Sequence, residues 1–424
     1  MVLRAHGLVH MAQNTPKIYI SKQQHYGCMM CGRCCRRFHV LITKAEIERL
    51  SKLDWTGEAD VPEAFFTEIK GFNYFKRKDD GGCVFLDDRG VCRMHKRFGF
   101  ERKALTCRGY PFNIVSTFKG EVSVLARMDC SSVVDDCGPE IRAQEKDIEK
   151  LVSELRFGNG FSPEQLCGMD RKAVEALCAH LQEIVNDASL SMPDRARLLM
   201  ALADRAERLG GVFLSDHKTM EEVYPSLIAS MKAALPEQLR FNIGFLARCL
   251  FRQWLASYCR RDEEILHPGM GTRIAHAWNI AKLTAGFGNL CKLGWEHPDF
   301  PARKASLFDT RQVKSTSDAW DIFRKFLSVR LECFQFFGVA YYGTNIFDGL
   351  RTLFLTYPVT LALARLSAAS RGAGAIERED VRYAVLAMDH AHGRSPALRF
   401  KTTRTREKFF ASQYSQLIFS LGEE

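Results

Sequence analysis

The amino-acid sequence predicts two parts of different fold class. We expect an α+β cysteine-cluster domain over residues 1–142 and a mainly α-helical domain over residues 143–424. Nine of the fifteen cysteines precede residue 140, in a region punctuated by glycines. After that region, apolar residues recur mostly at helical spacing. A chain of 424 residues is also longer than one ordinary hydrophobic core, which favours more than one domain.

The first regular elements are expected soon after the earliest cysteines. The segment HVLITKAEIERLSKL, residues 39–53, predicts a short extended run that leads into a helix. Thr43 followed by Glu46 is a capping-box signature, in which each side chain satisfies a backbone N–H of the other residue. We therefore place the start of this helix just after Thr43.

Two hairpins are expected further along the first part. The segment GGCVFLDDRGVCRMH, residues 81–95, has short apolar runs on both sides of the Asp87–Gly90 turn, where Gly90 can take a positive φ. The segment STFKGEVSVLARM, residues 116–128, predicts a second hairpin that turns at Lys119–Gly120.

The second part is expected to be a series of amphipathic helices. Ser162 before Pro163 is a favourable helix start, because proline is tolerated in a first helical turn. The predicted helices cover residues 139–157, 163–185, 192–209, 236–259, 318–337 and 377–391.

No segment predicts a membrane span or a secretory signal. The longest uncharged apolar stretch, Leu353–Ala364, is shorter than the roughly 18–20 residues that a span needs, and Pro358 interrupts it. We expect it to form a buried helix. The first twenty residues have no apolar run long enough for a signal peptide. The expected localisation is cytoplasmic, where cysteines stay reduced and disulfides are not expected.

Four cysteines fall within eight residues in the segment CMMCGRCC: Cys28, Cys31, Cys34 and Cys35. Thiolates three positions apart can turn back onto one metal ion, and this spacing occurs here twice in succession. The same C-x2-C-x2-C spacing occurs in bacterial ferredoxins, where a distant cysteine completes the cluster. Cys35 directly follows Cys34, and adjacent side chains usually diverge, so Cys35 could serve a second site or simply pack.

The remaining ligands must come from distant positions. The candidates are Cys83, Cys92 and Cys107, followed by Cys130 and Cys137. Cys83 and Cys92 stand on either side of the first predicted hairpin turn, which could bring their thiols together. Imidazole also suits zinc and iron, which adds His25, His39 and His95 as substitutes.

Metal binding is the preferred interpretation of these cysteines. Reduced structural thiols are disfavoured, because exposed unpaired thiols are prone to oxidation. A thioredoxin-like redox pair would need one C-x-x-C rather than this dense array. The number of thiols and the ferredoxin-like spacing favour an iron–sulfur cluster. Four-coordinate zinc is the alternative, and it would need only three clustered cysteines and one distal residue.

The chain has a formal charge of +10, and basic residues crowd the cysteines. They could form a solvated surface, compensate the negative charge of metal-bound thiolates, or attract an acidic partner. Because no known nucleic-acid module is recognisable, nucleic acid is not an expected partner.

The segment CMMCGRCCR, together with the later GGCVFLDDRGVCRMHKRFGFERKALTCRGYPF, resembles the CxxCxxCC cysteine-cluster family of zinc- or iron-chelating proteins. In that pattern the distal positions are Cys83, Cys92 and Cys107, followed by a Tyr110-Pro111 step. The layout of the whole chain is similar to that of the flagellin lysine-N-methylases. This resemblance implies an iron–sulfur cluster and methyl transfer from S-adenosylmethionine to lysine side chains of a partner protein such as flagellin. Cys130 matches a late cysteine of that layout.

The residues themselves do not contain a standard S-adenosylmethionine site. No strand is followed by G-x-G-x-x-G and a helix, and the C-x3-C-x2-C triad of radical enzymes is absent. A methylase of this sequence would need an unusual cofactor site. Two other functions therefore remain open: a redox protein, and a protein in which the metal is a structural staple and the helices bind a partner.

Overall fold

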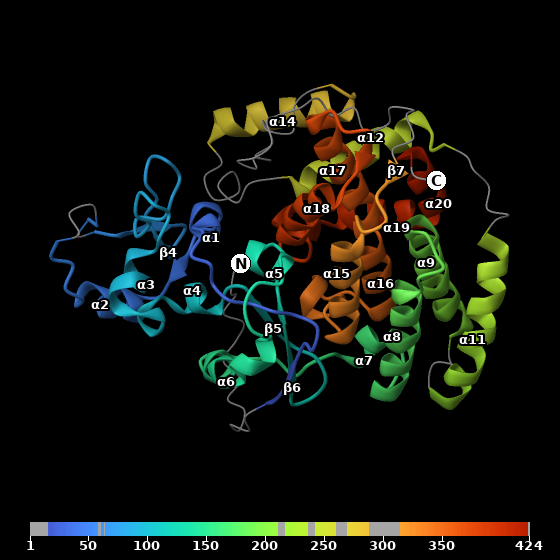
Figure 1. The fold of residues 1–424 in the computed structure, drawn as a ribbon, viewed down its shortest axis with the longest axis horizontal. Helices are drawn as coiled ribbons and strands as arrows, with labels where there is room; N and C mark the ends of the chain where they lie inside the picture. Colours follow the sequence, from blue (N-terminus) through green and yellow to red (C-terminus); the bar gives the residue numbers. More distant parts are fainter. Residues whose placement is uncertain are drawn as a thin grey trace.

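The fold is described from a computed structural model, which covers residues 16–57, 61–62, 64–210, 217–235, 242–259, 269–287 and 314–422. Three regions can be distinguished in Figure 1. A small cysteine-bearing unit extends to one side, a short sheet lies near the middle, and a large body of helices fills the other side. The predicted order, an α+β N-terminal region followed by a mainly helical remainder, is confirmed.

The cysteine-bearing unit is built from short elements. Its three-stranded sheet has the order β2-β4-β3, with both neighbouring pairs antiparallel. The strands are β2 (Leu41–Ile42), β3 (Phe66–Ile69) and β4 (Phe72–Phe75). The helices are α1 (Arg33–Arg37), α2 (Lys44–Ser51), α3 (Arg93–Phe98) and α4 (Leu105–Gly109), with the 3₁₀ turn η1 (Phe100–Arg102).

Local sequence signals decide where the elements of this unit begin. The capping box of α2 is present, since the Thr43 side chain accepts from the Glu46 backbone N–H and Glu46 accepts from that of Thr43. The Asp87–Gly90 turn also forms, and Gly90 has a φ of 81°. The expected flanking strands do not form, because only one antiparallel bridge, between Leu86 and Cys92, holds the two sides together.

The second sheet connects the unit to the helical body. Its order is β1-β6-β5, with β1 (Lys17–Ile20) parallel to β6 (Glu121–Ala126) and β5 (Phe112–Ser116) antiparallel to it. The predicted hairpin of residues 116–128 is therefore confirmed, although its first strand begins earlier. Just after β1, the Gln24 side chain forms two hydrogen bonds with the backbone of Ala126. These bonds fix the start of the following cysteine segment next to the end of β6.

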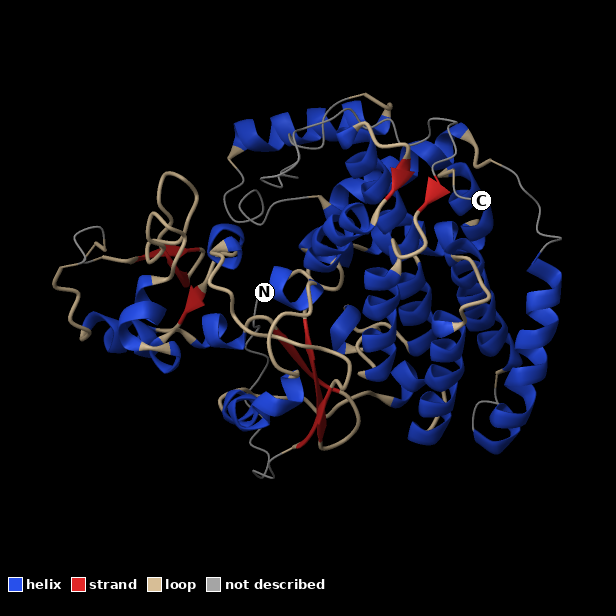
Figure 2. Cartoon of the chain, viewed as in Figure 1, coloured by secondary structure: helices blue, strands red, loops and turns tan. Residues whose placement is uncertain are grey.

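The helical body contains most of the remaining residues, as Figure 2 shows. Its earlier helices are α5 (Ser131–Val134), α6 (Glu145–Ser153), α7 (Pro163–Leu166), α8 (Arg171–Asn186), α9 (Met192–Leu209), α11 (His217–Ala234), α12 (Phe245–Tyr258) and α14 (Met270–Thr284). Its later helices are α15 (Asp321–Glu332), α16 (Ile346–Phe354), α17 (Thr356–Arg371), α18 (Arg378–Ala391), α19 (Lys401–Ser412) and α20 (Tyr414–Ser420). Short elements complete it: η2 (Ile141–Gln144), η5 (Val339–Tyr341), η6 (Pro396–Arg399) and the strand pair β7 (Lys314–Ser315) and β8 (Ala375–Ile376).

The helix prediction for residues 163–185 was wrong in one respect. Ser162 does cap the first turn, but that helix ends after one turn at Cys167, which has a left-handed backbone. Gly168 also has a positive φ, of 84°. A new helix then starts behind the Asp170 cap. Residues 236–241 of another predicted helix lie outside the described residues.

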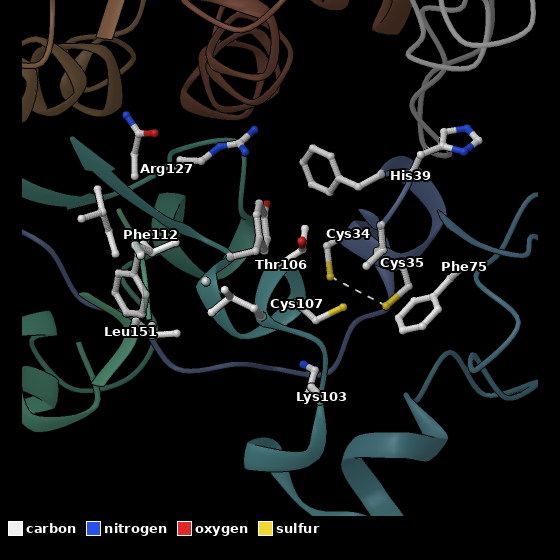
Figure 3. A pocket seen from close by; sticks show the side chains of 18 of the residues that line it. Cys34, Cys35, His39, Phe75, Lys103, Thr106, Cys107, Phe112, Arg127 and Leu151 are labelled. Atoms are coloured by element: carbon white, nitrogen blue, oxygen red, sulfur yellow. Dashed lines mark hydrogen bonds between the residues drawn. The ribbon is translucent and has the colours of Figure 1, made fainter. Parts of the chain in front are cut away.

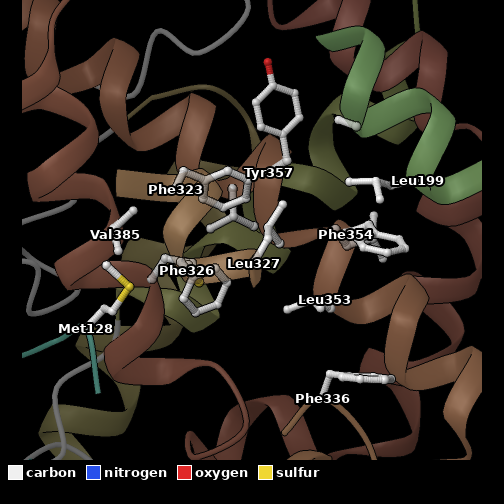
Figure 4. Packing of buried hydrophobic residues seen from close by; sticks show 14 of the residues in the cluster. Met128, Leu199, Phe323, Phe326, Leu327, Phe336, Leu353, Phe354, Tyr357 and Val385 are labelled. Carbon is white, nitrogen blue, oxygen red and sulfur yellow. The ribbon is translucent and has the colours of Figure 1, made fainter. Parts of the chain in front are cut away.

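One hydrophobic cluster unites the second sheet with the helices. It extends from Val124 of β6 to Phe326 and Tyr357 of the helical body, and Figure 4 shows its aromatic centre. The cysteine-bearing unit has a separate, smaller cluster around Phe65 and Phe85. Residues of the predicted first domain thus belong to two different hydrophobic clusters. The domain boundary at residue 142 stays a prediction.

The expected buried helix is confirmed as part of the large core. By length and composition, the helical run Ile346–Arg371 is apolar enough to cross a membrane, but 94% of its most apolar window is buried inside the structure. Pro358 lies in the first turn of α17, where a missing backbone N–H is tolerated. The helical run Ile346–Arg371 is thus longer than the apolar stretch Leu353–Ala364 from which the buried helix was predicted.

A buried ionic network joins the second sheet to α15 and α18. The Asp389 carboxylate pairs with Arg330 and accepts the Met128 backbone N–H at 2.8 Å. Next to it, Asp129 pairs with Arg127 and lies 3.2 Å from His390. Burial raises the pKa of Asp389, but the neighbouring arginines outweigh burial and lower it. The network therefore holds the segment after β6 against the helices that follow much later in the chain.

We predict that Asp389→Asn lowers the free energy of unfolding by about 3–5 kcal/mol, because it leaves buried arginine charge uncompensated. The exposed variant Asp88→Asn should change it by about 0.5 kcal/mol or less. Because the pKa of Asp389 is lower in the folded state, its contribution is present above pH of about 4 and is lost as the pH falls. Chemical unfolding at pH 7 and at a pH of about 2–3, below the ordinary aspartate pKa, measures both effects; equal stability of the two variants at pH 7 would contradict them.

Candidate metal centre

A cavity of about 290 Å³ lies between the cysteine-bearing unit and the second sheet. Its wall is largely aromatic and aliphatic. Five of the seven cysteines predicted as ligands line this single cavity: Cys34, Cys35, Cys83, Cys92 and Cys107. Figure 3 shows the sulfur atoms of Cys34, Cys35 and Cys107 directed toward the same space. Thiols that are up to 73 positions apart in sequence are thus gathered in one place.

The first two thiols are placed by helix α1. Gly32 precedes α1 with a φ of 68°, and a Cβ atom there would lie 2.6 Å from the Gly90 carbonyl oxygen. Glycine is therefore required where the cysteine segment crosses the Asp87–Gly90 turn. Within α1, the Sγ atoms of Cys34 and Cys35 are 3.9 Å apart. Both adjacent thiols line the cavity, contrary to the expectation that their side chains would diverge.

The three distal thiols come from the segment between β4 and β5. The Cys83 backbone N–H donates to the Cys35 carbonyl oxygen at 2.9 Å, which anchors this segment to α1. Cys92 is the N-cap residue of α3. Cys107 lies within α4. The expected proximity of Cys83 and Cys92 is thus achieved by the turn and the Leu86–Cys92 bridge, without a regular hairpin.

The other two predicted ligands, Cys28 and Cys31, are exposed and do not line the cavity. Cys28 follows a segment in which the Tyr26 backbone N–H donates to the Pro139 carbonyl oxygen at 2.9 Å. The segment opposite Tyr26 also contains Cys137, two positions before Pro139. Burial first, and then the thiols of Cys28 and Cys130, raise the pKa of Tyr26. Cys28 therefore shares the surroundings of Tyr26 with Cys130, one of the thiols that remained open candidates.

The three candidate histidines are distributed differently. His39 lines the cavity and meets Tyr74 edge-on, with ring centroids 6.3 Å apart. His25 lies 3.6 Å from Asp136. His95 packs edge-on against Phe100. Of the three, only His39 lines the cavity, and Figure 3 shows its ring directed away from the labelled sulfur atoms.

Three of the cavity thiols, those of Cys34, Cys83 and Cys107, have raised pKa values and are protonated at neutral pH. Burial raises the pKa of Cys83 to about 12. Burial also raises the pKa of Cys107 far above its ordinary value, although Lys103 opposes this. For Cys34, the hydrogen bond with Cys35 is the largest cause of a raised pKa, and burial adds to it. A metal must therefore displace protons from these thiols when it binds.

Lys103 is a member of the site that sequence reasoning counted only among the surrounding basic residues. Its side chain lines the cavity beside the thiols, and Figure 3 shows it close to Cys107. Burial lowers the pKa of Lys103, but nearby thiols, led by Cys107 and Cys92, outweigh this and raise it. The signal available in the sequence was the position of Lys103 between two predicted ligands. Its orientation depends on the fold.

The residue types of the wall suit a metal bound by thiolates. Their sulfur atoms, however, are not arranged around one common metal position. Among the residues that the structure describes, no three His, Cys, Asp or Glu side chains are arranged so that they could hold one metal ion. Closure around an ion therefore requires the thiol side chains to move toward one another. Sulfur is the ligand that zinc and iron–sulfur clusters prefer, and the described wall offers five thiols and no carboxylate.

Aromatic and cationic side chains form the wall that faces the helical body. The Arg127 guanidinium lies over the rings of Phe38 and Tyr110, at 5.1 and 5.3 Å from their centroids. The Phe38 ring also packs 5.2 Å from the ring of His390 on α18. By contrast, Arg108 turns away and binds Glu154 through two hydrogen bonds. Arg108 and Tyr110 both lie close to Cys107 in the sequence, but only Tyr110 lines the cavity.

Comparison with known families agrees with this placement. Residues 27–151 match the sequence model of the CxxCxxCC family, which is described as "Putative zinc- or iron-chelating domain". The matched range contains all seven predicted ligands and Lys103. The resemblance found in the sequence is therefore confirmed for this part of the chain, and the match supports a metal cofactor there.

Curated relatives include proteins of two microorganisms. An uncharacterized protein of Methanocaldococcus jannaschii is 27% identical over 132 residues, which are 31% of this chain and 45% of the relative. The Lysine-N-methylase of Salmonella typhimurium is 19% identical over 238 residues, which are 54% of this chain and 56% of the relative. Each alignment thus spans about half of the relative's own length. No solved structure gives a significant match.

We predict that Cys107→Ala loses most of the metal that the full chain binds after reconstitution, because a central thiol of the cavity is removed. Cys178→Ala is the matched control, since Cys178 is also buried but lies in α8 among core residues. Elemental analysis after gel filtration gives the metal bound per chain. Equal metal content in the two variants would exclude Cys107 as a ligand.

Proposed function

We propose that residues 27–151 hold an iron–sulfur cluster in the cavity between the cysteine-bearing unit and the second sheet. The observation that carries this proposal is the gathering of five thiols and one half-buried lysine in a described wall without carboxylates. Cys34, Cys35, Cys83, Cys92 and Cys107 are the proposed cavity ligands. Cys28 and Cys31 are the ligands proposed to fold in from the exposed side when the centre forms.

Iron is preferred to zinc because of the number and spacing of the thiols. Structural zinc is satisfied by four ligands, and the cavity alone offers five thiols before Cys28 and Cys31 are added. The C-x2-C-x2-C spacing of Cys28, Cys31 and Cys34 is typical of cluster-binding segments. A cluster would supply redox capacity or a Lewis-acidic iron. The chain's own residues would bind it, exclude water from it and compensate its charge.

We predict that the full chain, purified without oxygen, is brown and contains iron and acid-labile sulfide. Visible absorption, together with iron, sulfide and zinc analysis, measures this. Reconstitution of an aerobically purified sample with iron and sulfide should restore the same spectrum. A colourless anaerobic sample with stoichiometric zinc would contradict the iron proposal and favour zinc in the same cavity.

We further propose that the chain is a protein-lysine methylase acting in the cytoplasm on flagellin-like proteins. The similarity to the Lysine-N-methylase of Salmonella typhimurium supports this, because its 238 aligned residues exceed the cysteine domain and must continue into the helical body. In this reaction, the methyl–sulfur bond of S-adenosylmethionine breaks and its electron pair stays on sulfur. The lone pair of a neutral lysine Nζ forms the new N–C bond, and the lysine loses a proton to solvent.

We predict that the cluster-containing chain transfers the labelled methyl group of S-adenosylmethionine to lysines of a purified flagellin. Mass spectrometry of the acceptor, with lysine-acetylated flagellin as the control, locates the added methyl groups. Cys34→Ala should lose the transfer together with the cluster. The methylase proposal would be abandoned if cluster-replete protein neither binds nor consumes S-adenosylmethionine.

One observation favours a second candidate, a metal-stapled protein without methylase activity. The cysteine-bearing unit has its own small hydrophobic cluster, which contains Cys83 and against which Cys35, Cys92 and Cys107 pack. A metal bound there would crosslink the elements of a unit whose core is small. This candidate predicts that metal removal loosens the unit in hydrogen exchange and that no transfer is detected at any cluster occupancy.

A further inference from the structure

The backbone of Lys103 is fixed at the entrance to α4, so the direction of its side chain is determined by the fold. Its carbonyl oxygen accepts hydrogen bonds from Arg49 at 3.2 Å and from Arg108 at 3.3 Å. Its backbone N–H donates to the Phe100 carbonyl oxygen at 3.1 Å. The ammonium group lies 5.4 Å from the centroid of the Phe100 ring. This is a directed side chain rather than a mobile surface lysine.

Among the described residues, no carboxylate pairs with the Lys103 ammonium. No Asp or Glu is among the residues that line the cavity. Within the described parts of the chain, no carboxylate lies within ion-pair distance of Lys103. Its neighbours in the cavity wall are instead the thiols of Cys34, Cys92 and Cys107. A half-buried ammonium without a carboxylate in the same wall is costly, so its surroundings favour an anionic partner.

We propose that Lys103 is the charge-compensating residue of the metal centre, positioned so that its ammonium stabilises the net negative charge of metal-bound thiolates. This inference rests on the proposed metal site and adds a role for a residue that is not itself a ligand. Four thiolates around a divalent cation leave a net charge of about −2, which a fixed positive charge in a water-poor wall stabilises.

Three variants separate charge from packing. Lys103→Met keeps the length and apolar stem of the side chain but removes its charge. Lys103→Arg keeps the charge. Lys96→Met removes an exposed charge from the neighbouring helix α3 and controls for net charge. Circular dichroism and the near-ultraviolet spectrum of each full-length variant establish that it folds like the parent chain.

Zn²⁺ is the probe, because its affinity can be measured by chelator competition without redox chemistry. At fixed pH and ionic strength, Lys103→Met should bind Zn²⁺ about 10- to 100-fold more weakly than the parent chain, the range usual for groups that support metal ligands. Lys103→Arg should recover most of the affinity, and Lys96→Met should bind like the parent. If Lys103→Met binds Zn²⁺ as tightly as the parent chain, the inference is overturned while the metal site stands.

A second readout uses the reconstituted cluster. Loss of a nearby positive charge disfavours the more negative, reduced state, so Lys103→Met should have a lower reduction potential than the parent and Lys103→Arg. Equal potentials in all three proteins would also overturn the role. If the parent chain binds neither Zn²⁺ nor a cluster, the proposed function fails, and this inference fails with it.

Discussion

The structure of the site depends on one electrostatic constraint: thiols and an ammonium group line one partly buried cavity whose described wall contains no carboxylate. Lys103 alone would be a half-buried charge without a carboxylate in that wall, and closely spaced thiolates alone would repel one another. Each group lowers the cost of the other only when the fold brings them to the same wall. A thiolate-bound cation completes this balance, which is why the arrangement favours a metal centre over a set of inert core cysteines.

The helical body contributes to the site by fixing the wall opposite the thiols. Arg37, at the end of α1, donates two hydrogen bonds of 3.4 Å to the Leu386 carbonyl oxygen of α18. The next residue, Phe38, packs between Tyr110 and His390. The cysteine-bearing helix is therefore attached to α18 as well as to its own unit. This attachment links the position of the cysteine-bearing helix to the helical body.

Much of this site follows from the sequence, and the rest required distant contacts. The spacing of Cys28 to Cys35 and the cysteines around the Asp87–Gly90 turn predicted a set of candidate ligands, because metal-binding spacing is a local property, and five of these seven line one cavity. The convergence of Cys83 with Cys35 depends on one backbone hydrogen bond between distant segments, which no periodicity encodes. Lys103 was one basic residue among many until the fold placed it among the thiols. The split of the helix at Cys167 was missed because apolar spacing continues across the left-handed turn.

X-ray absorption spectroscopy of the metal-loaded full chain tests the central claim most directly, since it reports which atoms surround the metal. If thiolates from separate segments close around a shared centre, the nearest atoms are sulfur at about 2.3 Å. That sulfur signal should disappear when Cys34 and Cys107 are both replaced by alanine. A nearest shell of nitrogen or oxygen in the parent chain, unchanged by the double substitution, would contradict the thiolate centre.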